Sequence, residues 1–283
     1  MNKNKRVSIV IPVYNEEEYL SACLDAIAGQ TVRPYEVIVV DNNSTDNSVA
    51  VATRYPFVRI IYEKSQGVVY ARDAGFDQTK GGIIGRIDAD TLLAPTWVEA
   101  VQRIFDDPTV DAVSGSITYR DIMFTEFFRR AELFFRQWVA NGLKKDGFLY
   151  GSNMAMRRSA WQAARESTCN SRGLHEDIDL GIHASAAAQR VVFDKDLHVA
   201  VHLRRFDTTF YDFLQWAWLT PRTYTQHGIY SQWRIACVAA LATLFYWPIK
   251  FLHKGYNAEN RSFSWQKLFA PVTQRVNPAT FVD

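Results

Sequence analysis

Four short runs of apolar residues are spaced along the first 90 residues of the chain. They span residues 7–13, 35–41, 58–62 and 83–88, and each is rich in Val or Ile. Such runs, bounded by polar turns, are typical of strands buried on both faces of a sheet. Between the first two runs a helix is expected, with Asn15 as its cap, acidic residues in its first turn and Gly29 at its end. Strands and helices that alternate in this way predict an α/β fold with a mainly parallel central sheet flanked by helices.

The second half of the chain is richer in aromatic residues. Further strands are predicted at 110–118, 191–193 and 197–203. Residues 121–138 predict a long amphipathic helix with a broad, mostly aromatic stripe. We expect this stripe to pack into the core, and a face turned toward lipid or an acceptor is the alternative.

Residues 235–249 form a stretch of fifteen residues without a charge. A helix of that length spans ~22 Å, which is short of the roughly 30 Å hydrocarbon core of a bilayer. We therefore expect one helix that lies on a membrane surface, with Arg234 and Lys250 beside its ends. A tight transmembrane span and burial against the rest of the protein are the two alternatives.

Composition narrows the class of protein. The chain has 283 residues, 48% apolar and 22% charged, which indicates a folded body, and its net charge of +2 does not indicate a nucleic-acid partner. From Arg204 onward nine Lys and Arg face four Asp and Glu, so that part carries +5 and the first 203 residues carry −3. A basic, aromatic C-terminal part suits a phosphate-bearing or anionic lipid surface. Three widely spaced cysteines show no zinc-site spacing and no disulfide framework, and they favour reduced thiols in the cytosol.

Two carboxylates one residue apart, Asp88 and Asp90, follow the fourth apolar run. Ligands of open α/β sheets bind beyond the carboxyl ends of the strands, so both side chains are expected at such an edge. Neighbouring carboxylates repel each other unless a cation lies between them. Oxygen ligands favour Mg²⁺ or Mn²⁺, usually shared with phosphates of a substrate. Because no glycine-rich dinucleotide fingerprint and no Walker lysine motif is present, a nucleotide here would be held by side chains and a cation.

Four stretches in this order and spacing resemble the inverting glycosyltransferases of family two, which have the Rossmann-like GT-A fold. They are residues 7–17, 36–46, 67–75 and 88–90, and they extend over most of the first 115 residues. The resemblance implies nucleotide-binding roles for Pro12, Tyr14, Glu16, Asp41, Arg72, Asp88 and Ala89. It also implies that Asp88 and Asp90 bind the divalent metal, with His202 as a further candidate ligand. Asp73 stands where that family has Asn.

A second acidic motif, Glu176-Asp177 with Leu180, resembles the segment of the family that holds the catalytic base. The resemblance assigns the base to Asp177, while Glu176 would orient it or contact the acceptor; Asp179 is expected to be structural. An acidic helix N-terminus is the ordinary alternative. The resemblance further places Arg204 and Arg205 at the diphosphate, and Gly151, Ser152 and Asn153 at the sugar or acceptor. The motif of processive members is missing, which predicts transfer of a single sugar.

These features predict a GT-A catalytic domain over residues 1–206, with a nucleotide-binding half to about 118 and an acceptor half from 119. Residues 207–283 are predicted to form a helical region that associates with a membrane. The predicted activity moves one sugar from a nucleoside-diphosphate sugar to an acceptor hydroxyl or a lipid phosphate. The acceptor is expected to be a glycan or lipid-linked, at the inner face of the cell membrane. A sugar-phosphate nucleotidyltransferase and a catalytically silent nucleotide-sugar-binding protein of this fold are the alternatives.

Overall fold

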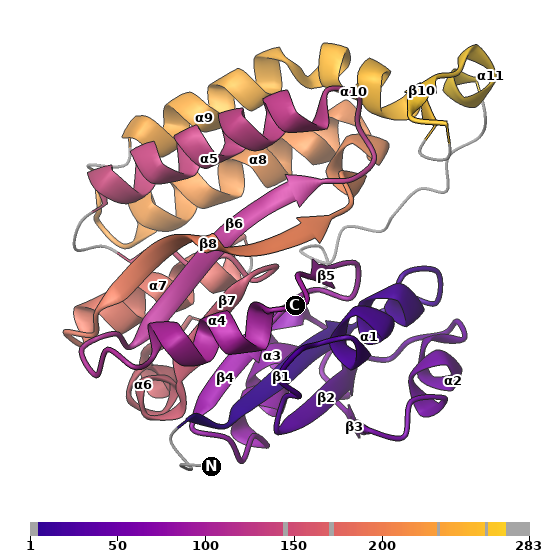
Figure 1. The fold of residues 1–283 in the computed structure, drawn as a ribbon. Coiled ribbons are helices and arrows are strands. Elements are labelled where there is room, and N and C mark those ends of the chain that lie inside the picture. Colours follow the sequence, from indigo (N-terminus) through magenta and orange to yellow (C-terminus); the bar gives the residue numbers. More distant parts are fainter. Residues whose placement is uncertain (1–4, 144–146, 170–172, 231–232, 258–259, 270–283) are drawn as a thin grey trace.

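In the computed structural model, residues 5–143, 147–169, 173–230, 233–257 and 260–269 are described. Within these residues a single eight-stranded sheet runs through the molecule in the order β3-β2-β1-β4-β7-β6-β8-β5 (Figure 1). Its strands are β1 (Val7–Val13), β2 (Glu36–Asp41), β3 (Val58–Tyr62), β4 (Ile83–Arg86), β5 (Leu92–Leu93), β6 (Ala112–Tyr119), β7 (Met154–Arg157) and β8 (Val191–Val201). Strands β1 to β4 are parallel, β7 runs antiparallel to both β4 and β6, and β8 runs parallel to β6. The predicted mainly parallel α/β sheet is confirmed.

The central strand β1 is covered on both faces, because successive side chains of a strand point to opposite sides. Ile9 and Ile11 pack with α1 (Leu20–Ala28), α2 (Ser48–Thr53) and α4 (Trp97–Ile104). Val10 points the other way and belongs to a core that also draws on α3 (Val68–Asp77), α6 (Arg158–Ala164) and α7 (Glu176–Ala186). The apolar runs are therefore continuous because both faces are buried.

The polar groups of the first half gather where β1, β2 and β4 end. These strands are parallel, so their carboxyl ends meet at one edge of the sheet. The antiparallel strand β7 begins at the same edge, since Met154 pairs with Arg86. Asp88 and the segment before β7 are thereby brought together from distant parts of the sequence.

Two local expectations were wrong. Asn15 has a left-handed backbone, and its side-chain oxygen accepts a hydrogen bond from the Thr45 N–H at 2.8 Å. Because Asn15 binds the loop after β2, α1 begins later, at Leu20, and has no acidic residue in its first turn. The two short strands predicted at 191–193 and 197–203 are one strand, β8, whose register with β6 shifts between Gly115 and Ser116.

A layer of helices stacks over β6 and β8 (Figure 1). It consists of α5 (Thr125–Gly142), α8 (Phe210–Gln226), α9 (Trp233–Leu244) and α10 (Tyr246–Lys254). Helix α5 was expected, but the prediction that its aromatic stripe packs into the core was wrong for Phe124, Phe127 and Phe134, which are 62–67% exposed. The turns of α5 that face the protein bury Arg136 and Val139 instead, and the Arg136 guanidinium lies 3.6 Å from the centre of the Tyr150 ring.

The single helix expected over 235–249 is broken. Helix α9 ends at Leu244 and α10 begins at Tyr246, and their axes differ by 57°. The buried Tyr246 donates its hydroxyl to the Thr208 carbonyl at 2.7 Å, which fixes the start of α10 against the segment before α8. In the described part of the chain, no helix alone has the length and apolar character of a membrane span, and only this bent pair reaches them jointly.

The remaining elements are short. They are the 3-10 helices η2 (Arg165–Ser167) and η3 (Arg204–Asp207), the strands β9 (Tyr256–Asn257) and β10 (Ser262–Phe263), and the helix α11 (Trp265–Leu268). After residue 207 the described elements are thus helices and one short two-stranded sheet, and residues 231–232, 258–259 and 270–283 lie outside the description.

Candidate active site

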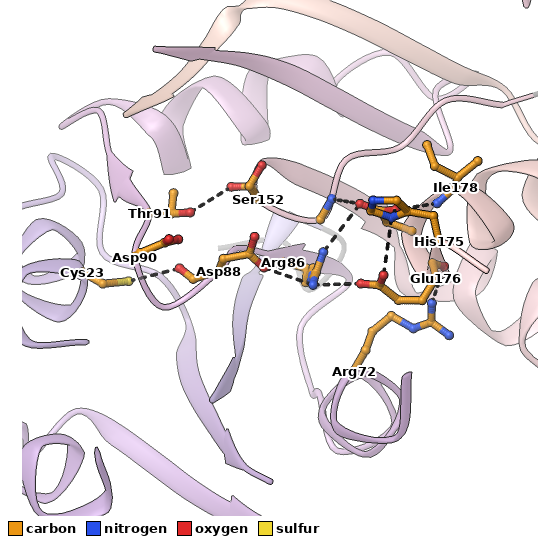
Figure 2. A network of polar contacts seen from close by, with 12 residues as sticks. Cys23, Arg72, Arg86, Asp88, Asp90, Thr91, Ser152, His175, Glu176 and Ile178 are labelled. Carbon is orange, nitrogen blue, oxygen red and sulfur yellow. Dashed lines mark hydrogen bonds and ion pairs between the residues drawn. The ribbon is translucent and has the colours of Figure 1, made fainter. Parts of the chain in front are cut away.

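The guanidinium of Arg86, at the end of β4, lies at the centre of the site (Figure 2). Its Nη2 is 3.1 Å from Asp88 Oδ1 and 2.9 Å from Glu176 Oε1, and its Nη1 is 3.9 Å from Asp177 Oδ2. Burial alone would lower the pKa of Arg86, but the three carboxylates outweigh burial and raise it. One buried cation therefore joins the acidic motif after β4 to the acidic motif that opens α7.

Asp177 is almost fully buried and is held by several donors. Its Oδ1 accepts from the Ile178 N–H at 2.7 Å and pairs with His175 Nδ1 at 2.6 Å, and its Oδ2 accepts from the Gly151 N–H at 2.6 Å. Burial alone would raise the pKa of Asp177, but His175, Arg86 and the Gly151 N–H hold it well below its usual range. Asp177 is therefore ionised at neutral pH despite its burial.

His175 is a partner of Asp177 that the sequence analysis did not single out. Burial would lower the pKa of His175, but the charge and hydrogen bond of Asp177, helped by Glu176, raise it. Its backbone N–H donates to Thr223 Oγ1 of α8 at 2.9 Å. The imidazole is thus held between the base candidate and the helical layer, where it can stabilise a negative charge on Asp177.

Because Gly151 has no side chain, it leaves room for the Arg86 guanidinium. A Cβ atom on Gly151 would fall 0.7 Å from Arg86 Nη1, so no other residue fits without displacing the guanidinium. The neighbouring Ser152 carbonyl accepts from Thr91 Oγ1 at 3.3 Å (Figure 2). Asn153 is fully buried, and its amide bonds Trp97 Nε1, the Ser116 carbonyl and the Leu197 carbonyl. Of the three residues expected at the sugar or acceptor, Gly151 binds Asp177 and Ser152 binds Thr91, next to Asp90. Asn153 instead links β6 to β8 through its amide group.

Arg72 is buried on α3 and reaches toward α7. Its Nη1 donates to the Glu176 carbonyl at 2.6 Å and its Nε to Asp73 Oδ1 at 2.8 Å. Burial raises the pKa of Asp73, and the Arg72 charge works against that rise. Asp73 thus supplies a carboxylate for Arg72, and Arg72 in turn binds the first residue of α7.

Arg204 connects the other side of the site. Its Nη1 donates to Glu16 Oε2 at 2.6 Å and to Asp90 Oδ2 at 3.2 Å, and its guanidinium lies over the Tyr19 ring. Arg205 lies over the Trp216 ring of α8. The two neighbouring arginines therefore stack on rings from different parts of the chain, and Arg204 contacts the acids Glu16 and Asp90 at the edge of the sheet.

The remaining candidates lie around the ends of β1 and β2. Asp41 is buried at the end of β2 and accepts from the Ser44 N–H at 3.3 Å, whereas Pro12 and Tyr14 are partly exposed on and beside β1. Ala89 is buried between the paired acids. His202 pairs with Asp121 at 3.2 Å and packs its ring against the edge of Tyr19.

The donor chemistry of Asp88 and Asp90 fits a hard divalent cation, because both offer carboxylate oxygens. In the described residues two groups of three or more convergent ligand side chains occur, and neither contains Asp88 or Asp90. A metal held by this pair would take its other ligands from substrate phosphates and water, which is usual for Mg²⁺.

Residues 8–163, more than half of the chain, match the model of Glycosyl transferase family 2. The chain belongs to this glycosyltransferase family. Glycosyltransferase AglE of Haloferax volcanii is 37% identical over 120 residues, 40% of each chain. The undecaprenyl-phosphate 4-deoxy-4-formamido-L-arabinose transferase of Serratia proteamaculans is 35% identical over 112 residues, 36% of this chain and 34% of that one. These matches span two-fifths or less of the relatives' own length.

Solved structures of other glycosyltransferases share the fold, and the GT-A assignment is confirmed. The mannosyltransferase PcManGT of Pyrobaculum calidifontis, in complex with GDP-Man and Mn²⁺, aligns with a TM-score of 0.57 at 22% identity, over 84% of this chain and 75% of that one. Glucosyl-3-phosphoglycerate synthase of Mycobacterium tuberculosis, with Mn²⁺, UDP-glucose and phosphoglyceric acid, aligns with a TM-score of 0.53 at 18% identity, over 82% and 80%.

Two residues of this candidate site, Arg86 and His175, were not predicted from the sequence. Arg86 had a signal, since an arginine inside an otherwise apolar run must find buried acids. His175 directly precedes the acidic pair, but nothing in its spacing indicates that its ring turns back onto Asp177.

Proposed function

We propose that this family-two protein is an inverting glycosyltransferase that moves one sugar from a nucleoside-diphosphate sugar to an acceptor hydroxyl or a lipid phosphate. The observation that carries the proposal is the Arg86 guanidinium, which contacts Asp88 after β4 and both Glu176 and Asp177 on α7. Asp88, expected at the donor, and Asp177, expected to be the base, therefore lie in one site on either side of Arg86.

The donor binds at the edge where β1, β2 and β4 end. Asp41 recognises the base, and Pro12, Tyr14, Glu16 and Ala89 line the nucleotide. Asp88 and Asp90 hold a divalent metal, Mg²⁺ or Mn²⁺, that offsets charge on the leaving diphosphate. Two structural neighbours, solved with Mn²⁺ and a nucleotide sugar, support this role.

Arg204 adds a positive charge on the same side, beside Glu16 and Asp90. A guanidinium can fork onto phosphate oxygens, so Arg204 can exchange its carboxylate partners for the diphosphate when the donor binds. Arg205, directed toward Trp216, follows as a weaker diphosphate candidate.

Asp177 takes the proton of the acceptor hydroxyl. Among the described residues its Oδ2 accepts one hydrogen bond, from Gly151, which leaves one lone pair of that oxygen for a substrate. His175 and the Ile178 N–H hold Oδ1 and thereby fix the carboxylate plane. Glu176 orients this arrangement through Arg86. A positioned carboxylate of this kind contributes roughly 10²–10⁴ to the rate.

The acceptor is a glycan or is lipid-linked, and the protein works on the inner face of the cell membrane. The similarity to the undecaprenyl-phosphate 4-deoxy-4-formamido-L-arabinose transferase of Serratia proteamaculans supports this. The exposed large apolar side chains support it too: among the described residues, three lie before residue 120, and the others belong to or adjoin the later helices. Trp247 and Phe251, four residues apart on one face of α10, are exposed near the basic Lys254, and Phe245 is exposed directly before the helix. Such a face fits an interfacial helix.

The central test is Asp177→Asn, which keeps the shape of the side chain but removes the base. Nucleoside-diphosphate release from a panel of donor sugars with Mn²⁺ is expected to fall by about 10²–10⁴, and Asp90→Ala is also expected to abolish turnover. Asp196→Asn, an exposed acid on β8, is the matched control and keeps full turnover.

Unchanged turnover in a folded Asp177→Asn protein contradicts the proposal. Release of pyrophosphate from a nucleoside triphosphate by the wild-type protein supports the nucleotidyltransferase alternative instead. Donor binding, seen as a raised melting temperature, without any turnover supports a silent binding protein.

Membrane association has its own test. The double variant Phe245→Ser, Trp247→Ser is expected to lose co-sedimentation with vesicles that contain anionic phosphatidylglycerol. Tyr62→Ser removes an equally exposed aromatic residue from β3 and keeps it. Equal binding of all three proteins, or none by the wild type, excludes α10 as the docking element.

A further inference from the structure

A cluster of metal-binding side chain types lies outside the active site. It consists of Cys169 after η2, Asp179 and His183 on α7, and His227 directly after α8. One ligand atom from each residue lies within 4.8 Å of all the others. Four such atoms, from three separate segments of the chain, thus converge on one point.

The separations inside this cluster resemble the edges of a metal tetrahedron. The Cys169 Sγ atom is 3.6 Å from His183 Nε2, and His183 Nε2 is 3.5 Å from Asp179 Oδ1. Zinc bonds of about 2.0–2.3 Å place neighbouring ligand atoms roughly 3.3–3.6 Å apart. His227 Nε2 is closer to Asp179 Oδ1, at 2.8 Å, so these two atoms need only move apart by about half an ångström.

The surroundings prepare the ligands for a cation. Asp179 is 1% exposed, and its second oxygen, Oδ2, accepts from the Cys169 N–H at 2.8 Å, which leaves Oδ1 directed at the histidines. An outer hydrogen bond of this kind orients a ligating carboxylate. The rings of His183 and His227 stand edge to face, with centres 4.9 Å apart.

We propose that Cys169, Asp179, His183 and His227 bind one Zn²⁺ ion. A thiolate with two imidazoles and a carboxylate suits zinc and excludes the hard ions that Asp88 and Asp90 would hold. Four protein ligands complete a tetrahedron, so this site is structural and leaves no position for a substrate. Asp179 and His183 are four residues apart, which puts both on one face of α7.

The ion would fasten α7 to the end of α8 and to the segment after η2. Asp177 and Asp179 leave α7 in different directions: Asp177 bonds Gly151, and Asp179 bonds Cys169 and His227. Zinc at the second position therefore holds the helix that carries Glu176 and Asp177 at its first turn. The sequence spacing hides this site, because the ligands come from widely separated segments that only the fold brings together.

The test uses the full chain without any sugar donor, so its outcome does not depend on the proposed transferase activity. After chelation and dialysis, the protein is titrated with Co²⁺, which absorbs visibly in tetrahedral sites and shows a near-ultraviolet charge-transfer band when bound by thiolate. All proteins carry Asp90→Ala to remove binding at the paired acids. We expect stoichiometric binding with both signals, and displacement of Co²⁺ by Zn²⁺.

Cys169→Ser is expected to lose the thiolate band and to bind Zn²⁺ at least tenfold to a hundredfold more weakly. Cys237→Ser, which changes an exposed cysteine on α9, is the matched control and keeps both. His227→Gln gives an independent second variant, and Zn²⁺ is expected to raise the melting temperature of the control but not of this variant.

The proposal is overturned if Co²⁺ binds without a thiolate band, or if Cys169→Ser and His227→Gln bind Zn²⁺ as the control does. It is equally overturned if the control binds no stoichiometric metal, since the cluster would then be held by its hydrogen bonds alone.

Discussion

Similar apolar side chains are buried in the sheet half of the molecule but partly exposed in the helical layer over β6 and β8. Along β1, Val7, Ile9, Val10 and Ile11 have no exposed surface, whereas α5 leaves Phe127 and Phe134 largely exposed. A central strand has other strands along both of its edges and helices over both of its faces, so every apolar side chain in it becomes buried. A surface helix buries only the stripe that finds a partner, so its composition alone does not decide its burial.

The two regions also differ in their charges. Arg86, inside the sheet, is buried against three carboxylates, while Arg129 on α5 makes an exposed pair with Glu126. Water screens the second pair but not the first. Replacing Arg86 should therefore lower the free energy of unfolding strongly, whereas replacing Arg129 should change it little.

Replacing Arg86 with methionine gives the largest expected effect. It leaves Glu176 buried without its closest cation and Asp177 with His175 alone, and breaking a buried ion pair costs about 3–5 kcal/mol of unfolding free energy. Urea denaturation measures the loss, and donor turnover is expected to vanish with it. Arg129→Met is the control and leaves the denaturation midpoint unchanged. Equal midpoints for the two variants would show that the sheet half does not depend on Arg86.

The second largest expected effect comes from truncating one aromatic side chain in each region and comparing the losses of unfolding free energy. Trp161 is 1% exposed and packs edge-to-face on Phe76, so Trp161→Ala is expected to cost about 3–5 kcal/mol. Phe134 on α5 is exposed, so Phe134→Ala is expected to stay within about 0.5 kcal/mol of wild type. Thermal and urea unfolding measure both. A large loss in Phe134→Ala would mean that α5 buries this ring against something that the chain itself provides.

Gly151→Ala probes the fit of the site with a single methyl group. The new Cβ would overlap Arg86 Nη1, and forced overpacking costs about 1–3 kcal/mol. Because the guanidinium must move, turnover should fall more steeply than stability. Gly29→Ala, whose Cβ would meet only ordinary contacts at 3.5 Å or more, is the control. Wild-type turnover in Gly151→Ala would contradict the placement of Arg86 beneath it.

The smallest expected effect is a difference in pH response. His253 on α10 faces the Asp121 carbonyl and Asp207, and although burial opposes its charge, Asp207 and Asp121 raise the pKa of His253. Its stabilisation is fully present below the unfolded pKa of about 6.5 and is lost as pH rises through the folded pKa. We expect the alkaline loss, about 1 kcal/mol, to disappear in His253→Gln, as measured by urea denaturation at a series of pH values.

Asp177 responds in the opposite direction. The folded pKa of Asp177 is depressed, so its contribution to stability is present above about pH 4 and is lost as pH falls further toward the folded pKa.

His198→Gln is the control for the His253→Gln prediction, because burial lowers the pKa of His198. An alkaline loss that persists in His253→Gln would assign it to a different group.

The sequence alone determined the parallel sheet, its strand ends and the acids placed there, because strands buried on both faces have a short, unambiguous pattern and the motifs are local. It also indicated the family and the candidate base. It did not give the links between Arg86 and α7, the ring of His175 on Asp177, or the convergence of Cys169 with His183 and His227. Those depend on side chains that are distant in the chain.

The break between α9 and α10 and the exposure of the α5 stripe were likewise decided by tertiary structure. Tyr246 is pinned to the Thr208 carbonyl, and α5 turns its Arg136 rather than its phenylalanines inward. Periodicity tells which residues share a face of a helix, but it does not tell what lies opposite that face. The packing partners supply that information, and they are fixed only when the whole chain has folded.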